Sequence, residues 1–228
     1  MKYGLIAPIL LASVLPILAS GVQDLTNADA TGGVKDALLQ GATNAVGKLG
    51  KADGFLKNPK VKIPLPDSLA KVEGLLRKVG MEKEADELVV SMNRAAETAV
   101  IEAKPLLRDA VKQMTIEDAK TILTGGDRAA TQYFRKKTEA PLRKKFLPIV
   151  KKSTGKVALA EKYDALAGKA SELHLVKEED ASIEEYVTRK ALDGLFRTIG
   201  DEEQAIRKDP AGQASSLIKK VFGALTGK

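Results

Sequence analysis

Apolar residues recur every three or four positions along almost the whole chain, which is the spacing of an α-helix and not the alternation of a β-strand. Ala, Leu, Lys and Glu dominate the composition and favour helix. The pattern predicts an all-α fold, a single-domain bundle of about seven or eight helices. One extended loop should interrupt it at residues 51–66, because three prolines there restrict the backbone to extended conformations.

Apolar positions and helix-capping residues together place the individual helices. We expect helices over about 33–49, 67–79, 82–114, 115–123, 138–153, 157–173, 182–208 and 210–225, with a short helical stretch before Thr138 that holds Ala129, Ala130, Tyr133 and Phe134. Side chains that accept backbone N–H bonds should begin several of them, namely Thr115, Asp127, Thr138, Ser182 and Asp209. Thr115 and Ser182 are each followed three residues later by an acid, as in a capping box. Pro105 should kink or split its helix, and Pro148 should kink another.

The first 21 residues have the layout of a secretory signal peptide. A short basic start precedes an apolar run over 4–19, and small residues follow as far as Gly21. The alternative is a retained membrane anchor, but the run is shorter than the roughly 20 residues of a spanning helix and contains Pro8 and Pro16. We therefore expect cleavage near Gly21, a mature all-helical domain over 22–228, export, and no membrane-spanning segment after cleavage.

Conventional catalytic chemistry is hard to assemble from this chain. It has no cysteine, which excludes disulfides, thiol nucleophiles, thiolate metal sites and iron–sulfur clusters. Its single histidine, His174, is not accompanied by a nucleophile elbow, and no HExxH, Walker A, GxGxxG or calcium-loop motif occurs. We assign no catalytic residue, no metal ligand and no cofactor, and we expect a protein that is not an enzyme.

Positive charge is concentrated in the segment from Arg135 to Lys156. The whole chain has 37 basic and 30 acidic side chains, a net charge of +7. The segment alone holds nine basic residues and one acid, Glu139, and so contributes +8. The residues expected to meet an anionic surface are Lys136, Lys137, Arg143, Lys144, Lys145, Lys151, Lys152 and Lys156. Cations beside an apolar helix face suit an anionic lipid or an envelope polymer, whereas an exported protein rarely meets nucleic acid.

Two other interpretations of the basic segment stay open. It can be an ordinary solvated face of the bundle whose apolar side is core. It can also be neutralised by the acidic residues within 178–185, inside one chain or between two chains, or be reserved for a protein partner.

Two polar clusters are further candidates for ligand binding. Glycines before a helix N-terminus can expose N–H groups to an anion, although the Asp127 carboxylate is expected to occupy that position as the cap. Arg94 and Glu97 are spaced as a surface ion pair, or as a buried network if another helix covers them. The candidate residues are Asn93, Arg94, Glu97, Gly125, Gly126, Asp127, Arg128, Thr131, Tyr133 and Arg135.

Long segments of the chain resemble a bacterial family known only as domain of unknown function 4197. They are DALLQGATNAV (36–46), DGFLKNPKVKIPLP (53–66), MNRAAE (92–97), DAKTILTGGDRAATQYFRKKT (118–138) and ALDGLFRTIGDEEQAIRKDP (191–210). The resemblance implies an exported, helical envelope protein of Gram-negative bacteria, and therefore a periplasmic location. It brings no known activity, ligand or catalytic residue.

Three functions fit these observations. The leading hypothesis is a non-enzymatic binding protein that docks an anionic envelope component or a partner through the basic segment. The second is a carrier whose bundle encloses a lipid or another hydrophobic ligand. The third is an envelope hydrolase in which Asp127 or Glu97 acts as acid or base and nearby arginines position an anionic substrate.

Overall fold

The computed structural model describes residues 26–70, 80, 82–164 and 182–226. All regular secondary structure in these ranges is helical, which confirms the all-α class. The labelled helices are α2 (Asn27–Leu49), α3 (Asp67–Ala70), α5 (Glu82–Val100), α6 (Ala103–Lys112), α7 (Ile116–Thr124), α8 (Ala129–Thr154), α10 (Ile183–Lys208) and α11 (Ser216–Thr226). Residues 158–164 are also helical.

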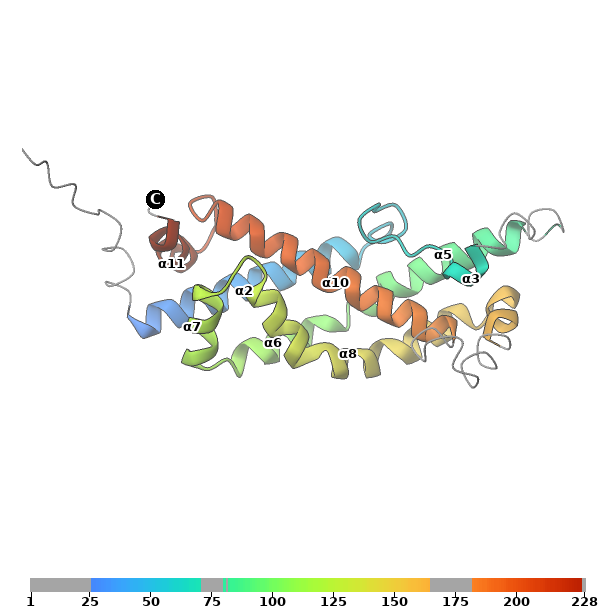
Figure 1. Cartoon of the computed structure of the whole chain (residues 1–228), viewed down its shortest axis with the longest axis horizontal. Helices are drawn as coiled ribbons and strands as arrows, with labels where there is room; N and C mark the ends of the chain where they lie inside the picture. The colour runs from blue at the N-terminus through green and yellow to red at the C-terminus, as the bar shows by residue number, and fades with distance from the viewer. Residues whose placement is uncertain (1–25, 71–79, 81, 165–181, 227–228) are drawn as a thin grey trace, which may run out of the picture.

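The long helix α10 is the common neighbour around which the bundle is built. It packs against α8, α2 and α5, and α8 packs against α5 along a second seam. Figure 1 shows α2 toward one end of the long axis and α5 toward the other, with α10 spanning both. Their apolar faces meet in a buried core that includes Leu49, Leu88, Phe146 and Phe196.

Helix α2 begins six residues before the predicted start at Gly33. Thr26 is its N-cap, and the Thr26 hydroxyl oxygen accepts a hydrogen bond from the backbone N–H of Asp29 at 3.0 Å. Glycine weakens an isolated helix, but α11 lies directly over this part of α2. A Cβ atom at Gly33 would come within 2.6 Å of Val221 Cγ2. The glycine is therefore the residue that permits close packing of the two helices.

The predicted helix over 82–114 is split, as the proline suggested. Helix α5 ends at Val100, a turn follows at 101–102, and Pro105 lies in the first turn of α6, where its missing N–H costs little. The capping box at the start of α7 is also confirmed, with Thr115 and Asp118 exchanging side-chain to backbone hydrogen bonds. The helix expected over 67–79 begins at Asp67, and its remainder after Ala70 lies outside the described residues.

The segment 51–66 is a loop without helix, as predicted, and it is packed against the bundle. Phe55, Val61, Ile63 and Leu65 are all buried. The Phe55 ring lies on α10 at Gly194, where a Cβ atom would approach the ring to 2.7 Å. The loop therefore contributes to the core.

Helix α8 is one continuous helix, so the prediction that Thr138 opens a new helix was wrong. The Thr138 side chain is buried, and its hydroxyl donates to the carbonyl of Phe134 at 2.7 Å, a bond formed inside a helix. Pro141 and Pro148 lie within α8 and are exposed, so water can reach the carbonyls that lack a helical donor. Figure 1 shows α8 curving along the lower edge of the bundle.

The junction between α10 and α11 also differs from the prediction. Ser182 is the N-cap of α10 and the helix runs to Lys208, both as expected. Asp209, expected to cap the next helix, instead terminates α10, and its carboxylate accepts from the N–H of Gly212 at 3.0 Å. Helix α11 starts only at Ser216, because residues 210–215 form turns.

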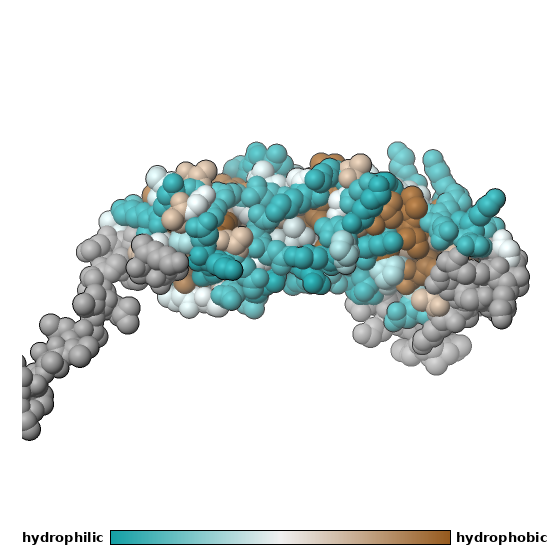
Figure 2. All heavy atoms as spheres, turned by 90° about the horizontal axis from the view of Figure 1, so that it is seen from above, coloured by the Kyte–Doolittle hydropathy of each residue, from teal (hydrophilic) through white to brown (hydrophobic). Residues whose placement is uncertain are grey.

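Polar side chains cover most of the face seen in Figure 2. Apolar surface gathers on that face beside the residues drawn in grey. Within the described ranges, none of the helices has both the length and the apolar character needed to cross a bilayer.

Candidate functional site

The polar residues at the middle of α5 hold the loop 51–66 in place. Asn93 is fully buried, and its amide binds both backbone groups of Ile63, accepting from the N–H at 2.9 Å and donating to the carbonyl at 2.8 Å. The second N–H of the amide donates to the carbonyl of Val89 at 2.8 Å. These bonds supply hydrogen-bond partners to buried backbone groups that lie outside any helix.

Glu97 extends this attachment toward the start of the loop. One carboxylate oxygen accepts from the backbone N–H groups of Phe55 and Leu56, at 3.0 and 3.1 Å. The other oxygen binds Arg94 at 2.7 Å, and Arg94 also binds Asp53 at 2.7 Å. A hydrogen bond from Lys57 and another from Arg94 lower the pKa of Asp53 below its usual value. Of the two possibilities left open by the sequence, a surface ion pair and a buried network, Glu97 lies in a buried network, Arg94 is half-buried, and a loop and not a helix covers them.

The start of α8 is capped from another helix, and the prediction that Asp127 caps it was wrong. Asp127 is exposed, and the N-cap residue Arg128 makes no side-chain capping bond. The Glu203 carboxylate of α10 accepts from the backbone N–H of Ala130 at 3.0 Å and of Thr131 at 2.9 Å. A third bond, from the Thr131 hydroxyl, measures 2.8 Å. An anion position is thus formed at this helix N-terminus and is filled by the protein's own carboxylate.

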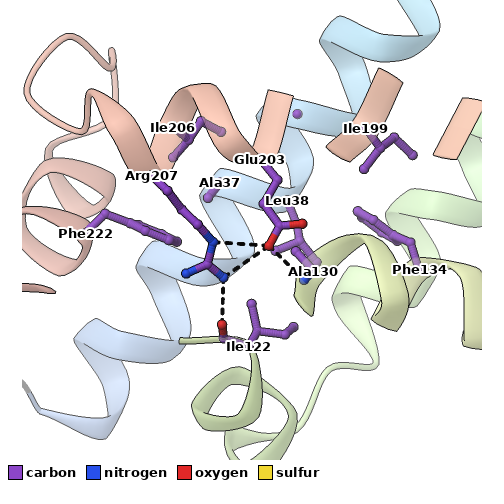
Figure 3. Close-up of a pocket in the computed structure, with 11 residues that line it drawn as sticks. Ala37, Leu38, Ile122, Ala130, Phe134, Ile199, Glu203, Ile206, Arg207 and Phe222 are labelled. Atoms are coloured by element: carbon purple, nitrogen blue, oxygen red, sulfur yellow. Dashed lines mark hydrogen bonds and ion pairs between the residues drawn. The ribbon is translucent and has the colours of Figure 1, made fainter. Parts of the chain in front are cut away.

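Arg207 completes this second network, as Figure 3 shows. Its guanidinium binds Glu203 at 3.1 Å, donates to the carbonyl of Ile122 at 2.7 Å, and lies 5.6 Å from the centre of the Phe222 ring. The adjoining cavity has a volume of about 20 Å³. That is enough for about one water molecule, so this cavity gives no support to the lipid-carrier hypothesis.

The remaining candidates near the GGD turn bind neighbouring parts of the fold. The Tyr133 hydroxyl donates to the carbonyl of Ala110 at 2.8 Å, and burial raises the pKa of Tyr133. Arg128 reaches Asp201 at 3.4 Å, and Arg135 reaches Asp193 at 3.0 Å while stacking over Phe196. Gly125 ends α7, and Gly126 is exposed in the turn that follows.

The two candidate clusters are separate networks, one at the loop 51–66 and one at the start of α8. The structure shows what their side chains bind within the chain; a role in ligand binding stays a prediction. Sequence reasoning missed Asp53, Glu203 and Arg207, which complete these networks. Only Asp53 carried a signal in the sequence, because Asp-Gly at 53–54 is a pair that favours turns. In the structure Asp53 adopts a positive φ of 66°.

The basic segment is different, because most of its charges face solvent. Arg135 and Arg143 are paired with acids, Arg143 with Glu185 of α10 at 2.5 Å. The lysines are exposed, and in the described part of the chain none of them is within ion-pair distance of an acid: Lys136, Lys137, Lys144, Lys145, Lys151, Lys152 and Lys156. The acidic residues 178–180, a suggested internal partner, lie outside the described residues.

Five of these lysines share one side of α8, which we call the lysine face: Lys137, Lys144, Lys145, Lys151 and Lys152. Lys137, Lys144 and Lys151 recur every seven residues, and the other two form an adjacent row. At 1.5 Å of rise per residue the face is about 21 Å long. Pro141 and Pro148 lie on the same side and have no backbone N–H. The solvent-facing edge of α8 is therefore cationic and lacks two backbone hydrogen-bond donors.

Comparison with known proteins gives a family but no activity. No curated protein and no solved structure matched the chain. The family model described as "Protein of unknown function (DUF4197)" matches residues 24–223, which include all the networks described above. The chain therefore belongs to the DUF4197 family.

Proposed function

We propose that this protein is a non-enzymatic, exported binding protein that docks an anionic component of the bacterial envelope through the lysine face of α8. The observation that carries the proposal is the exposure of five lysines on one side of a helix, with no acid paired to them among the described residues. The two arginines of the same segment are already paired with α10, so the lysines are the charges available to a partner.

The size of the effect favours an extended anionic surface over a single small anion. Each lysine near a strongly anionic membrane contributes about 1 kcal/mol. Five lysines spread over about 21 Å cannot converge on one phosphate, but they can contact several headgroups at once. Because these side chains are exposed, the attraction should weaken as salt shortens the screening length.

Export supplies the setting for this proposal and is itself part of it. The N-terminal 21 residues carry the pattern of a signal peptide, and they lie outside the described residues. Cleavage would release a domain whose cationic helix faces the lipids and polymers of the periplasm. Mass spectrometry of the protein recovered from the periplasmic fraction would measure the new N-terminus. An intact Met1 would refute cleavage.

Vesicle co-sedimentation tests the docking surface. Residues 22–228 are mixed with vesicles of phosphatidylglycerol or of phosphatidylcholine, at low and at physiological salt. We expect salt-sensitive binding to the anionic vesicles alone. The variant with Lys144, Lys145, Lys151 and Lys152 changed to Glu should lose that binding.

A matched control separates position from net charge. Lys51, Lys62, Lys208 and Lys219 are exposed lysines on other elements, and changing these four to Glu alters the net charge by the same amount. The control variant should still bind the anionic vesicles. The proposal is wrong if wild type does not bind, if the α8 variant binds as wild type does, or if both variants lose binding equally.

A further inference from the structure

An open cleft lies where the lysine face meets α5. Its lining comes from the α5–α6 junction on one side and from the last turns of α8 on the other: Thr98, Glu102, Pro148, Ile149, Lys152, Ser153 and Lys156. The cleft has a volume of about 610 Å³, within the range of small-ligand sites. Helices α5 and α8 pack against each other.

The charges of the cleft are divided between its two walls. Glu102 lies on the α5–α6 wall, and Lys152 and Lys156 lie on the opposite wall. All three side chains are exposed, and none has an ion-pair partner within the described ranges. The walls have not neutralised one another, so a carboxylate and two ammonium groups remain available to a ligand.

The hydroxyl groups of the cleft favour a ligand that donates hydrogen bonds. Thr98 donates its proton to the carbonyl of Arg94 at 2.9 Å, and Ser153 donates to Ile149 at 3.1 Å. Both oxygens therefore keep only acceptor capacity. The hydroxyl oxygens and the carboxylate can accept hydrogen bonds from an ammonium group, and the two lysines can bind a phosphate. The cleft therefore matches a zwitterionic ligand that carries both groups.

Apolar side chains in the lining extend this match to a lipid. Pro148 and Ile149 form part of the wall that carries Lys152 and Lys156. Apolar surface beside lysines suits the region just below the headgroups of a membrane.

We infer that this cleft binds the phosphoethanolamine headgroup of a membrane lipid. The phosphate pairs with Lys152 and Lys156, and the primary ammonium donates to Glu102. This inference rests on the proposed function, because it gives the docking surface a preferred headgroup. A choline headgroup should bind less well, because its trimethylammonium group has no N–H to donate to the carboxylate.

The test holds the surface charge constant and changes the headgroup. Vesicles contain a fixed fraction of phosphatidylglycerol, and the remainder is either phosphatidylethanolamine or phosphatidylcholine. We expect about fivefold tighter binding to the ethanolamine vesicles, the effect of one partly exposed charged hydrogen bond. Glu102→Gln should remove this difference and keep the phosphatidylglycerol-dependent binding. Glu117→Gln, an exposed glutamate of α7, should change neither.

A soluble probe makes the cleft testable without membrane docking. Methyl NMR should show shifts of Ile149 on titration with glycerophosphoethanolamine, smaller shifts with glycerophosphocholine, and reduced shifts in Glu102→Gln. Equal responses to both probes, or a difference that survives Glu102→Gln, would overturn the inference. If the wild-type protein does not bind the anionic vesicles but still distinguishes the two soluble probes, the docking proposal is refuted and the inference about the cleft stands.

Discussion

Asn93→Ala should detach the loop 51–66 from α5 and measurably destabilise the protein. The change removes both hydrogen bonds to Ile63, a residue that is 1% exposed, so water cannot replace them without opening the loop. Val89 keeps the helical donor to its carbonyl, so the cost arises mainly at the two backbone groups of Ile63. An unsatisfied buried group costs about 1–3 kcal/mol, which gives an expected loss of about 3 kcal/mol.

Chemical denaturation followed by circular dichroism measures this loss, and hydrogen exchange locates it. A loss of about 3 kcal/mol should lower the melting temperature by about 6–12 °C in a domain of this size. The amide of Ile63 should exchange much faster than in wild type. Gln132→Ala removes an exposed amide from α8 and should change stability by less than about 0.5 kcal/mol. A loss below about 1 kcal/mol in Asn93→Ala, or an equally protected Ile63 amide, would refute this account of the loop.

Three further perturbations test other contacts. Glu203→Leu should lower the free energy of unfolding by about 3–5 kcal/mol, because it removes the carboxylate that binds Arg207 and two N–H groups of α8. Gln204→Leu, on exposed surface, should be nearly neutral in the same denaturant unfolding, and equal losses would contradict the capping role. Gly33→Val should displace α11 and increase its proteolysis, and adding Val221→Ala should partly reverse the effect; unchanged proteolysis of Gly33→Val would show that the helices can separate without cost. Burial and the neighbouring Glu184 raise the pKa of Asp164 from 3.8 to about 6, against the hydrogen bond from the Ile183 N–H. Because the folded state holds this proton more tightly than the unfolded chain, the contribution of Asp164 to stability is lost as the pH rises from about 4 to about 6. Asp164→Asn should flatten this part of the plot of unfolding free energy against pH, and an unaltered plot would exclude the raised pKa.

The sequence correctly predicted the helix starts and breaks that are determined by residues close together in the chain. The capping box at Thr115, the N-cap at Ser182 and the split near Pro105 all involve bonds or clashes within a few residues. The prolines of the segment 51–66 also predicted a loop without helix, and the structure has one there.

The errors arose where a distant residue decides the local structure. Asp127 had the chemistry of a cap, but Glu203 supplies the cap from α10, 73 residues away from Ala130. Thr138 had the same chemistry, but its hydroxyl is satisfied within a continuous helix that packs against α10. The first helix was predicted to start at Gly33, six residues too late, because the sequence does not show that α11 packs over this part of α2.

The pairing of α2 with α11 joins the two ends of the described chain. Lys220 binds Asp29 at 2.8 Å across a separation of 191 residues, and the two helices lie together at one end in Figure 1. Contacts so distant in sequence form late in folding, because closing such a long loop costs conformational entropy before the contact stabilises the chain. Helix α2 thus completes its packing only after α11 has been made. A chain truncated before α11 would leave the glycine surface of α2 uncovered, so during synthesis this surface stays exposed until α11 is available.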